Sequence, residues 1–195
     1  LHGRQTRGKL GGPGSAAGVG TGVAAVVVVG AGAVVVGSPN EGFPAAVTDV
    51  QEASVTGPVV IAVDEEGGTV QRFDVLLGAL PSAAEMGSWS TDEVRNLARD
   101  RAAALIAFGV TVNLAPVVDV GSGPGIGTRS FSDDPVVVTT HGAAFAEGVL
   151  EGGLVPVAKH FPGHGRANAD SHAELATTPG LEELRMVDFL PFALV

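Results

Sequence analysis

Residues 59–66 read Val-Val-Ile-Ala-Val-Asp-Glu-Glu, a short apolar run that passes directly into three acidic side chains. An uninterrupted run of mostly β-branched residues at this length is typical of a strand buried inside a parallel sheet. Polar side chains that directly follow such a strand lie where an α/β enzyme carries its chemistry. The stretch therefore predicts an α/β fold with functional residues at one edge of its sheet.

Three further apolar runs are also followed by polar loop residues, and they cover residues 25–36, 110–114 and 154–158. Helical patterns lie between the runs. One helix is predicted from Thr91, with Ser90 or Thr91 as its N-cap, to a stop at Gly109. A second is predicted to begin after Asp133-Asp134-Pro135 and to run to Gly152-Gly153. This alternation of strands and helices predicts a parallel sheet with right-handed crossovers.

The uncharged stretch 11–40 has an alternative interpretation as a signal peptide or membrane anchor. Glycines and Pro13 interrupt it, and its apolar pieces, 23–29 and 31–36, are short and β-branched. We therefore interpret the two pieces as buried strands of the parallel sheet, and we predict no stable membrane span.

Composition excludes several classes of function. The formal net charge is −10, with 21 acidic residues against 11 Lys and Arg, so a nucleic-acid partner is not expected. The absence of cysteine excludes disulfides, thiolate catalysis and Cys-ligated zinc. The chain starts with Leu1 and stops at Val195 directly after an apolar stretch, which indicates part of a longer domain. The compartment is left open.

The densest group of chemistry-bearing residues is Lys-His-Phe-Pro-Gly-His-Gly at 159–165, followed by Asp-Ser-His at 170–172. An Asp two residues before a His can hold the imidazole in one tautomer and raise its basicity. A metal site built from His160, His164, Asp170 and His172 is the alternative. Its spacing matches neither H-E-x-x-H nor a paired-Cys site, so we expect no metal and no cofactor.

These residues resemble the signature of the glycoside hydrolase family 3 β-N-acetylglucosaminidases. Three further blocks resemble that family in the same order: residues 61–72, 113–120 and 129–135. Ser132 stands where the family usually has glycine. The resemblance implies a TIM (β/α)8-type barrel, of which this chain would hold the N-terminal portion of about four strands. The expected organisation is a Gly-rich segment, 1–24, followed by the partial catalytic domain, 25–195.

The resemblance also implies roles for individual residues. Side chains expected to hold the N-acetylglucosamine are Asp64, Arg129, Lys159 and His160. Arg72 would shape the same loop, with a structural salt bridge as an equal alternative. His172 matches the family's general acid/base, oriented by Asp170. The nucleophilic aspartate of the family lies on a later strand, and Asp188 is not expected to replace it.

Other polar residues are expected to have supporting roles. Glu65, Glu66 and Asp119 could be acid/base carboxylates, but loop support and hydrogen bonding at strand ends are favoured, and Asn113 is similarly ambiguous. The glycine-rich stretch 121–127 matches no phosphate-binding motif, which favours a flexible loop.

The resemblance implies an exo-acting, retaining hydrolase that removes terminal β-linked N-acetylglucosamine from peptidoglycan fragments or chitooligosaccharides, without cofactor. Two alternatives stay open: a family 3 β-glucosidase-like exo-glycosidase, and a truncated, inactive sugar-binding protein. The 195-residue chain by itself is expected to be inactive.

Overall fold

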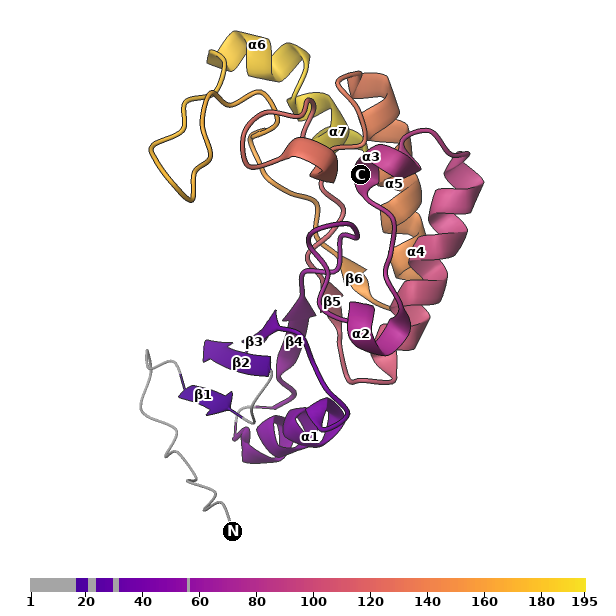
Figure 1. Ribbon diagram of the computed structural model, residues 1–195, viewed down its shortest axis with the longest axis vertical. Helices are drawn as coiled ribbons and strands as arrows, with labels where there is room; N and C mark the ends of the chain where they lie inside the picture. The colour runs from indigo at the N-terminus through magenta and orange to yellow at the C-terminus, as the bar shows by residue number, and fades with distance from the viewer. Residues whose placement is uncertain (1–16, 21–23, 30–31, 56) are drawn as a thin grey trace.

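The computed structural model describes residues 17–20, 24–29, 32–55 and 57–195 (Figure 1). These residues form a six-stranded sheet whose spatial order follows the chain, from β1 to β6. The strands β1 to β6 are Ala17–Gly20, Ala24–Val29, Gly32–Gly37, Val60–Val63, Val112–Asn113 and Val155–Pro156. The helices α1 to α7 are Phe43–Ala53, Asp74–Leu77, Ala83–Met86, Thr91–Ile106, Pro135–Glu151, Leu181–Met186 and Phe189–Leu194, and a 3-10 helix, η1, spans Gly127–Arg129.

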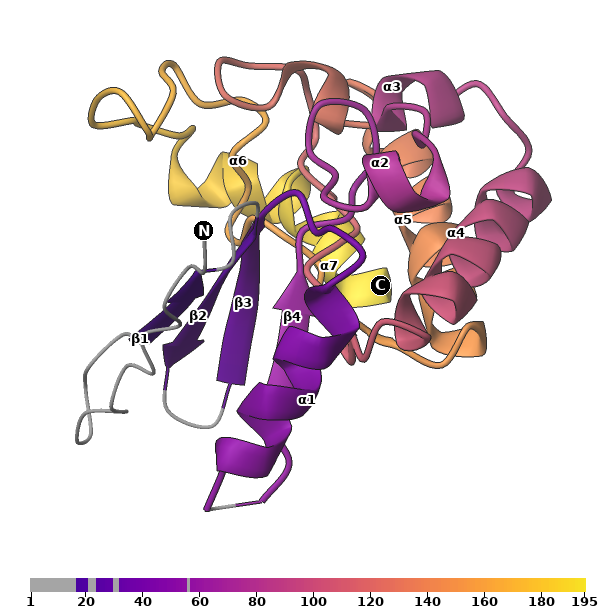
Figure 2. The ribbon, with the colours of Figure 1, turned by 60° about the horizontal axis from the view of Figure 1, so that its bottom comes forward.

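The strands from β3 to β6 are parallel, which confirms the predicted alternation of strands and helices. Val34 pairs with Ala62, Val63 with Asn113, and Val112 with Val155. Helix α1 connects β3 to β4, α4 lies between β4 and β5, and α5 lies between β5 and β6. Figure 2 shows α1 beside β3 and β4, with α4 and α5 together on the other part of the molecule. The carboxyl ends of β4, β5 and β6 therefore share one edge of the sheet.

The first apolar run departs from the prediction. It forms two strands, β2 and β3, which pair antiparallel, and β1 adds to β2 in the same sense. Only β3 joins the parallel strands, so the interpretation of both pieces as parallel strands was wrong. Two residues separate Val29 from Gly32, and a connection that short permits a hairpin but no crossover. Positions 23 and 31 of the predicted pieces, and most of the predicted segment 1–24, lie outside the described residues.

In the described ranges, no helix is both long enough and apolar enough to cross a bilayer.

The two long helices begin where their capping residues predict. Ser90 and Glu93 form a capping box at the start of α4, with the Ser90 amide donating to the Glu93 carboxylate at 2.9 Å. The Asp134 side chain caps α5. Helices α4 and α5 then pack backbone to backbone, since a Cβ on Gly148 would lie 2.2 Å from the Arg95 carbonyl oxygen. This close packing fixes α5, and with it the strand that follows.

One hydrophobic core joins the sheet to α1, α3, α4 and α5. Its aromatic part is a row of edge-to-face rings, Phe43 to Phe73 at 5.5 Å and Phe73 to Phe108 at 5.2 Å between centroids. Ile61 and Val63 of β4 are completely buried in this core. Burying one such side chain contributes about 1.5–3 kcal/mol, so the strand that precedes the acidic residues is firmly held.

Candidate functional site

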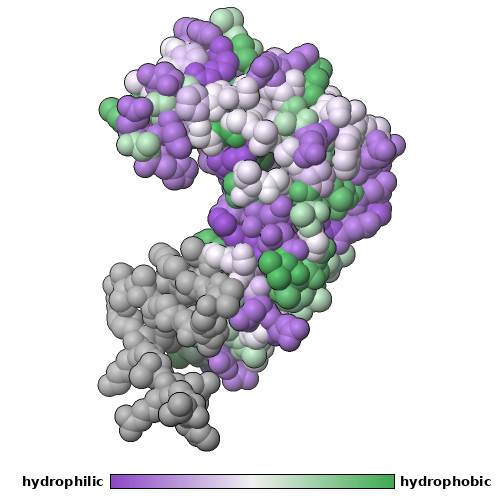
Figure 3. Space-filling model, viewed as in Figure 1, coloured by the Kyte–Doolittle hydropathy of each residue, from purple (hydrophilic) through white to green (hydrophobic). Residues whose placement is uncertain are grey.

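Polar side chains from two strand ends and one 3-10 helix converge at the carboxyl edge of the sheet. Asp64 and Glu66 follow β4, Lys159 and His160 follow β6, and Arg129 closes η1. We refer to these five side chains as the polar cluster. In Figure 3, hydrophilic residues gather on the concave side of the molecule, at the level where β4 ends. The parallel strands thus bring Lys159 into contact with Asp64, which lies 95 positions earlier in the chain.

Glu66 holds the two cations of the polar cluster. Its carboxylate accepts hydrogen bonds from Nε and Nη2 of Arg129 at 2.8 and 2.9 Å and lies 2.6 Å from Nζ of Lys159. The Glu66 side chain is only 4% exposed. Lys159 Nζ also donates to Asp64 Oδ1 at 2.5 Å. The hydrogen bond with Glu66 raises the pKa of the Arg129 guanidinium. Bidentate contact of this kind fixes direction as well as charge, so the cluster is preorganised.

Asp119 fixes His160 and the loop behind it. The buried Asp119 carboxylate accepts from His160 Nδ1 at 2.6 Å and from the His164 backbone N–H at 2.5 Å. His160 Nε2 lies 3.2 Å from Arg129 Nη2. With its Nδ1 proton facing Asp119, a neutral imidazole presents Nε2 as an acceptor to the guanidinium. Asp119 therefore acts through His160, and it is a supporting group in this geometry, as is Glu66.

Glu65 is completely buried and supports the loop after β4. Its carboxylate accepts from the backbone N–H groups of Arg72 at 2.7 Å and Phe73 at 3.1 Å, and Oε1 lies 3.2 Å from Arg101 Nη1. Burial raises the pKa of Glu65, because the interior disfavours the charged form. The Asn113 amide exchanges two hydrogen bonds of 3.1 Å with the Glu65 backbone. Both side chains hold the backbone that carries the acidic residues.

Arg72 contacts the buried Glu65 carboxylate through its backbone N–H group and not through its side chain. Its side chain is half-buried, and the salt bridge considered for it has no partner within the described part of the chain. Its Nε is buried without a hydrogen-bond partner there. A role in sugar binding stays a prediction.

Asp170 and His172 form the pair that their spacing predicts, apart from the polar cluster. His172 Nδ1 lies 2.8 Å from Asp170 Oδ1, which also accepts the His172 backbone N–H at 2.9 Å. These two bonds lower the pKa of the Asp170 carboxyl. We refer to the pair as the dyad. It lies on the loop drawn in yellow-orange in Figure 1, and the His172 side chain is 83% exposed.

Arg166 anchors the base of the loop that carries the dyad. Its guanidinium donates to Asp188 Oδ2 at 2.6 Å and to Glu183 Oε1 at 2.6 Å. Asp188 is fully buried, and a Cβ on Gly163 would lie 2.6 Å from the Asp188 Cβ. Asp188 is therefore an anchor for Arg166 at the start of α7. No motif in the sequence predicts this role of Arg166.

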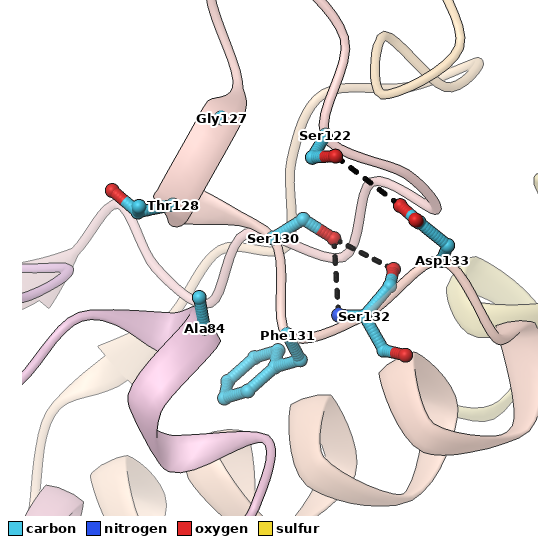
Figure 4. A pocket seen from close by; sticks show the side chains of 8 residues that line it. All are labelled: Ala84, Ser122, Gly127, Thr128, Ser130, Phe131, Ser132 and Asp133. Atoms are coloured by element: carbon cyan, nitrogen blue, oxygen red, sulfur yellow. Dashed lines mark hydrogen bonds between the residues drawn. The ribbon is translucent and has the colours of Figure 1, made fainter.

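A cavity of about 470 Å³ lies beside the loop that carries Arg129 (Figure 4). Its lining residues are Ala84, Ser122, Gly127, Thr128, Ser130, Phe131, Ser132 and Asp133. The Ser130 hydroxyl is used within the loop, at 2.7 Å from the Asp119 carbonyl oxygen. No member of the polar cluster or of the dyad lines this cavity, so it is a neighbouring depression. The site is better defined by the converging charged side chains.

Among the residues that the structure describes, no group of three or more His, Asp or Glu side chains could hold a metal ion. The rings of His160 and His164 are 6.4 Å apart between centroids.

Comparison with known proteins identifies the domain. The model of the glycosyl hydrolase family 3 N terminal domain matches residues 24–195. Beta-hexosaminidase LpqI of Mycobacterium tuberculosis is 42% identical over 168 residues, which cover 83% of this chain and 43% of that protein.

Solved structures agree with this match. A family 3 glycosyl hydrolase of Mycobacterium smegmatis has a TM-score of 0.73 at 43% identity, covering 78% of this chain and 47% of that one. NagZ of Neisseria gonorrhoeae, in complex with N-trifluoroacetyl-D-glucosamine, has a TM-score of 0.74 at 32% identity, covering 80% and 48%. The chain thus spans less than half the length of these relatives. The expected fold, the N-terminal portion of a TIM-type barrel, is confirmed, and the chain belongs to glycosyl hydrolase family 3.

Proposed function

We propose that the protein carrying this chain is a retaining exo-β-N-acetylglucosaminidase. It removes terminal, non-reducing β-linked N-acetylglucosamine from peptidoglycan fragments or chitooligosaccharides, without a metal or another cofactor. The observation that carries the proposal is the polar cluster, in which Glu66 holds Arg129 and Lys159 side by side at the carboxyl edge of the sheet. The naming of the M. tuberculosis relative as a beta-hexosaminidase supports the same substrate class.

The polar cluster has the chemistry that a sugar ring requires. Asp64 offers carboxylate oxygens as acceptors for sugar hydroxyls, and its side chain is 27% exposed, so it is reachable. Lys159 and Arg129 offer donors whose direction Glu66 already fixes. We propose that these three residues, with His160 and Arg72, bind the N-acetylglucosamine. Prior fixation by ion pairs reduces the entropy that the side chains lose on binding.

The dyad supplies the proton transfers in this proposal. With Nδ1 directed at Asp170, His172 presents Nε2 to the substrate. The imidazolium donates its Nε2 proton to the departing glycosidic oxygen, and the neutral ring then takes a proton from the attacking water. An imidazole titrates near neutral pH, which suits both steps. The ionised Asp170 stabilises the imidazolium that is present before the first transfer and after the second.

Retention requires a nucleophile that bonds to the anomeric carbon as the first C–O bond breaks. The family resemblance implies an aspartate on a later strand, beyond Val195. Water then attacks the anomeric carbon and releases the aspartate. Asp170 and His172 favour this assignment over a family 3 β-glucosidase, because the glucosidase branch generally lacks the Asp-Ser-His segment.

The test is proton NMR of the sugar released from an aryl β-N-acetylglucosaminide by the protein that carries this sequence. We expect the β-anomer to appear first, with turnover unaffected by a chelator. The α-anomer as first product, or activity abolished by chelator, would contradict the proposed mechanism. Faster turnover of an aryl β-glucoside would favour the glucosidase alternative.

A further inference from the structure

The glycine-rich stretch 121–127 lies directly against the loop that carries the dyad. The Gly123 backbone N–H donates to the Gly165 carbonyl oxygen at 2.7 Å, and a Cβ on Gly123 would meet that oxygen at 2.7 Å. A Cβ on Gly121 would lie 3.0 Å from the same oxygen. We refer to Gly121, Gly123 and Gly125 as the glycine seat. At this surface the backbone of the glycine-rich stretch packs directly against the backbone of the loop that carries the dyad.

Gly125 is the member of the seat that reaches the dyad. A Cβ added there would lie 2.9 Å from Asp170 Oδ1, the oxygen that holds His172. The Gly125 carbonyl oxygen accepts from Arg129 Nη1 at 2.9 Å. Gly125 has φ +83°, a conformation that glycine adopts readily and other residues do not. One residue therefore contacts both the polar cluster and the dyad.

The dyad loop is anchored at its base by ion pairs and further along by hydrogen bonds and by the buried side chains of Ala167 and Ala169. Arg166 joins the two ends of the loop by its ion pairs with Glu183 and Asp188. Above them, Asn168 and Thr177 exchange two backbone and side-chain hydrogen bonds of 3.1 and 2.8 Å. Gly125 approaches Asp170 next to these anchors, at the point where the loop begins to carry the dyad.

We propose that Gly125 is a positioning residue for the acid/base dyad, coupling it to the sugar-binding Arg129. The inference rests on the proposed function. The carbonyl of Gly125 is fixed by Arg129, and the space above its Cα is filled by the Asp170 carboxylate. Asp170 in turn sets the direction of the His172 ring. When Arg129 binds the sugar, its contact with Gly125 therefore also keeps the dyad at a defined distance from the sugar.

The test compares Gly125→Ala with Gly127→Ala. Both glycines have positive φ, +83° and +51°, but a Cβ on Gly127 would meet nothing within 4 Å. Gly125→Ala should displace Asp170 and lower kcat on an unactivated disaccharide by about tenfold to 10²-fold, since a misplacement of ~1 Å can cost 10²-fold. KM should stay near that of the wild type. The loss should be smaller with a 4-nitrophenyl leaving group, which needs little protonation. Gly127→Ala should change kcat by less than about twofold, because its Cβ displaces nothing.

A double-mutant cycle separates positioning from folding. In an Asp170→Ala background, Gly125→Ala should cause no further loss, because the residue through which it acts is already gone. Equal kcat losses in Gly125→Ala and Gly127→Ala would overturn the proposal. Additive losses in the cycle, or sugar binding lost together with kcat, would do the same. A wild-type protein that hydrolyses neither substrate would instead refute the proposed function.

Discussion

The polar cluster and the dyad are built in opposite ways. Glu66, at the centre of the cluster, is 4% exposed and holds two cations. His172 is 83% exposed, and its one polar partner among the described residues is Asp170. The cluster stands on strand ends that follow buried apolar strands. The dyad stands on a loop whose ion pairs lie at its base.

The difference separates two tasks. Groups that bind a sugar act best when they are already in place, since binding then orders fewer side chains. A group that serves first a leaving oxygen and then a water molecule must meet two partners in turn, and a loop permits this. Substitutions in the two regions should therefore affect different kinetic parameters.

The largest effect is expected from His172→Ala. Removing the general acid should lower kcat on an unactivated disaccharide by ~10²–10⁴-fold. KM should change little, because His172 lies apart from the polar cluster. Asp170→Ala should give a weaker form of the same defect. Steady-state kinetics with a disaccharide and an aryl glycoside check this, and a kcat within about threefold of wild type on the disaccharide would remove His172 from the mechanism.

Glu66→Gln should weaken sugar binding more than it slows the chemical step. The amide keeps the size of the side chain but removes the charge that holds Arg129 and Lys159 together. A hydrogen bond to a charged group is worth about 1.5–3 kcal/mol, and 1.4 kcal/mol is tenfold in affinity. We expect KM, and the Kd for free N-acetylglucosamine measured by calorimetry, to rise about tenfold or more, with a smaller change in kcat.

Glu52→Gln is the matched control, because Glu52 is exposed on α1. It should leave both constants at their wild-type values. If Glu66→Gln lowered kcat alone, the cluster would belong to the chemical step, and the separation of the two regions would be wrong.

Local rules predicted much of the fold. The N-cap of α4, the start of α5 near Pro135 and the apolar run before Asp64 are each decided by a few neighbouring residues. The hairpin of β2 and β3 was missed because both pieces have the apolar pattern of a parallel strand. Only the connection between them carries the opposite signal, because two residues permit a hairpin but no crossover.

The candidate site could be predicted less completely. The Asp170 and His172 contact spans two residues, and the spacing was sufficient to predict it. The bridge from Glu66 to Arg129 spans 63 residues, and no local pattern contains it. The role of Gly125 depends on two backbones approaching closely. Periodicity does not report such an approach, so the stretch resembled a flexible loop.

The smallest effect is expected at Glu65, the buried carboxyl in the loop after β4, and it concerns the pH dependence of the free energy of unfolding. Because burial raises the pKa of Glu65, the folded protein takes up this proton at a higher pH than the unfolded chain. The associated stabilisation is present below the ordinary pKa of about 4.3 and is lost as pH rises through the raised value. The free energy of unfolding of the wild type, minus that of Glu65→Gln, should therefore fall as pH rises above about 4.3. Urea unfolding of both proteins across this range measures the difference.

Glu93 supplies a control of the opposite sign. Hydrogen bonds from Ser90 lower the pKa of this exposed carboxyl. Its stabilisation is present above the ordinary pKa and is lost as pH falls through the lowered value, so Glu93→Gln should change the pH dependence in the reverse direction. If Glu65→Gln had the same sign as Glu93→Gln, the hydrogen bonds from the Arg72 and Phe73 backbone, together with the attraction of Arg101, would outweigh the burial of Glu65. Glu65 would then stabilise the fold as a hydrogen-bonded carboxylate, and its contrast with the exposed dyad would be one of burial but not of charge.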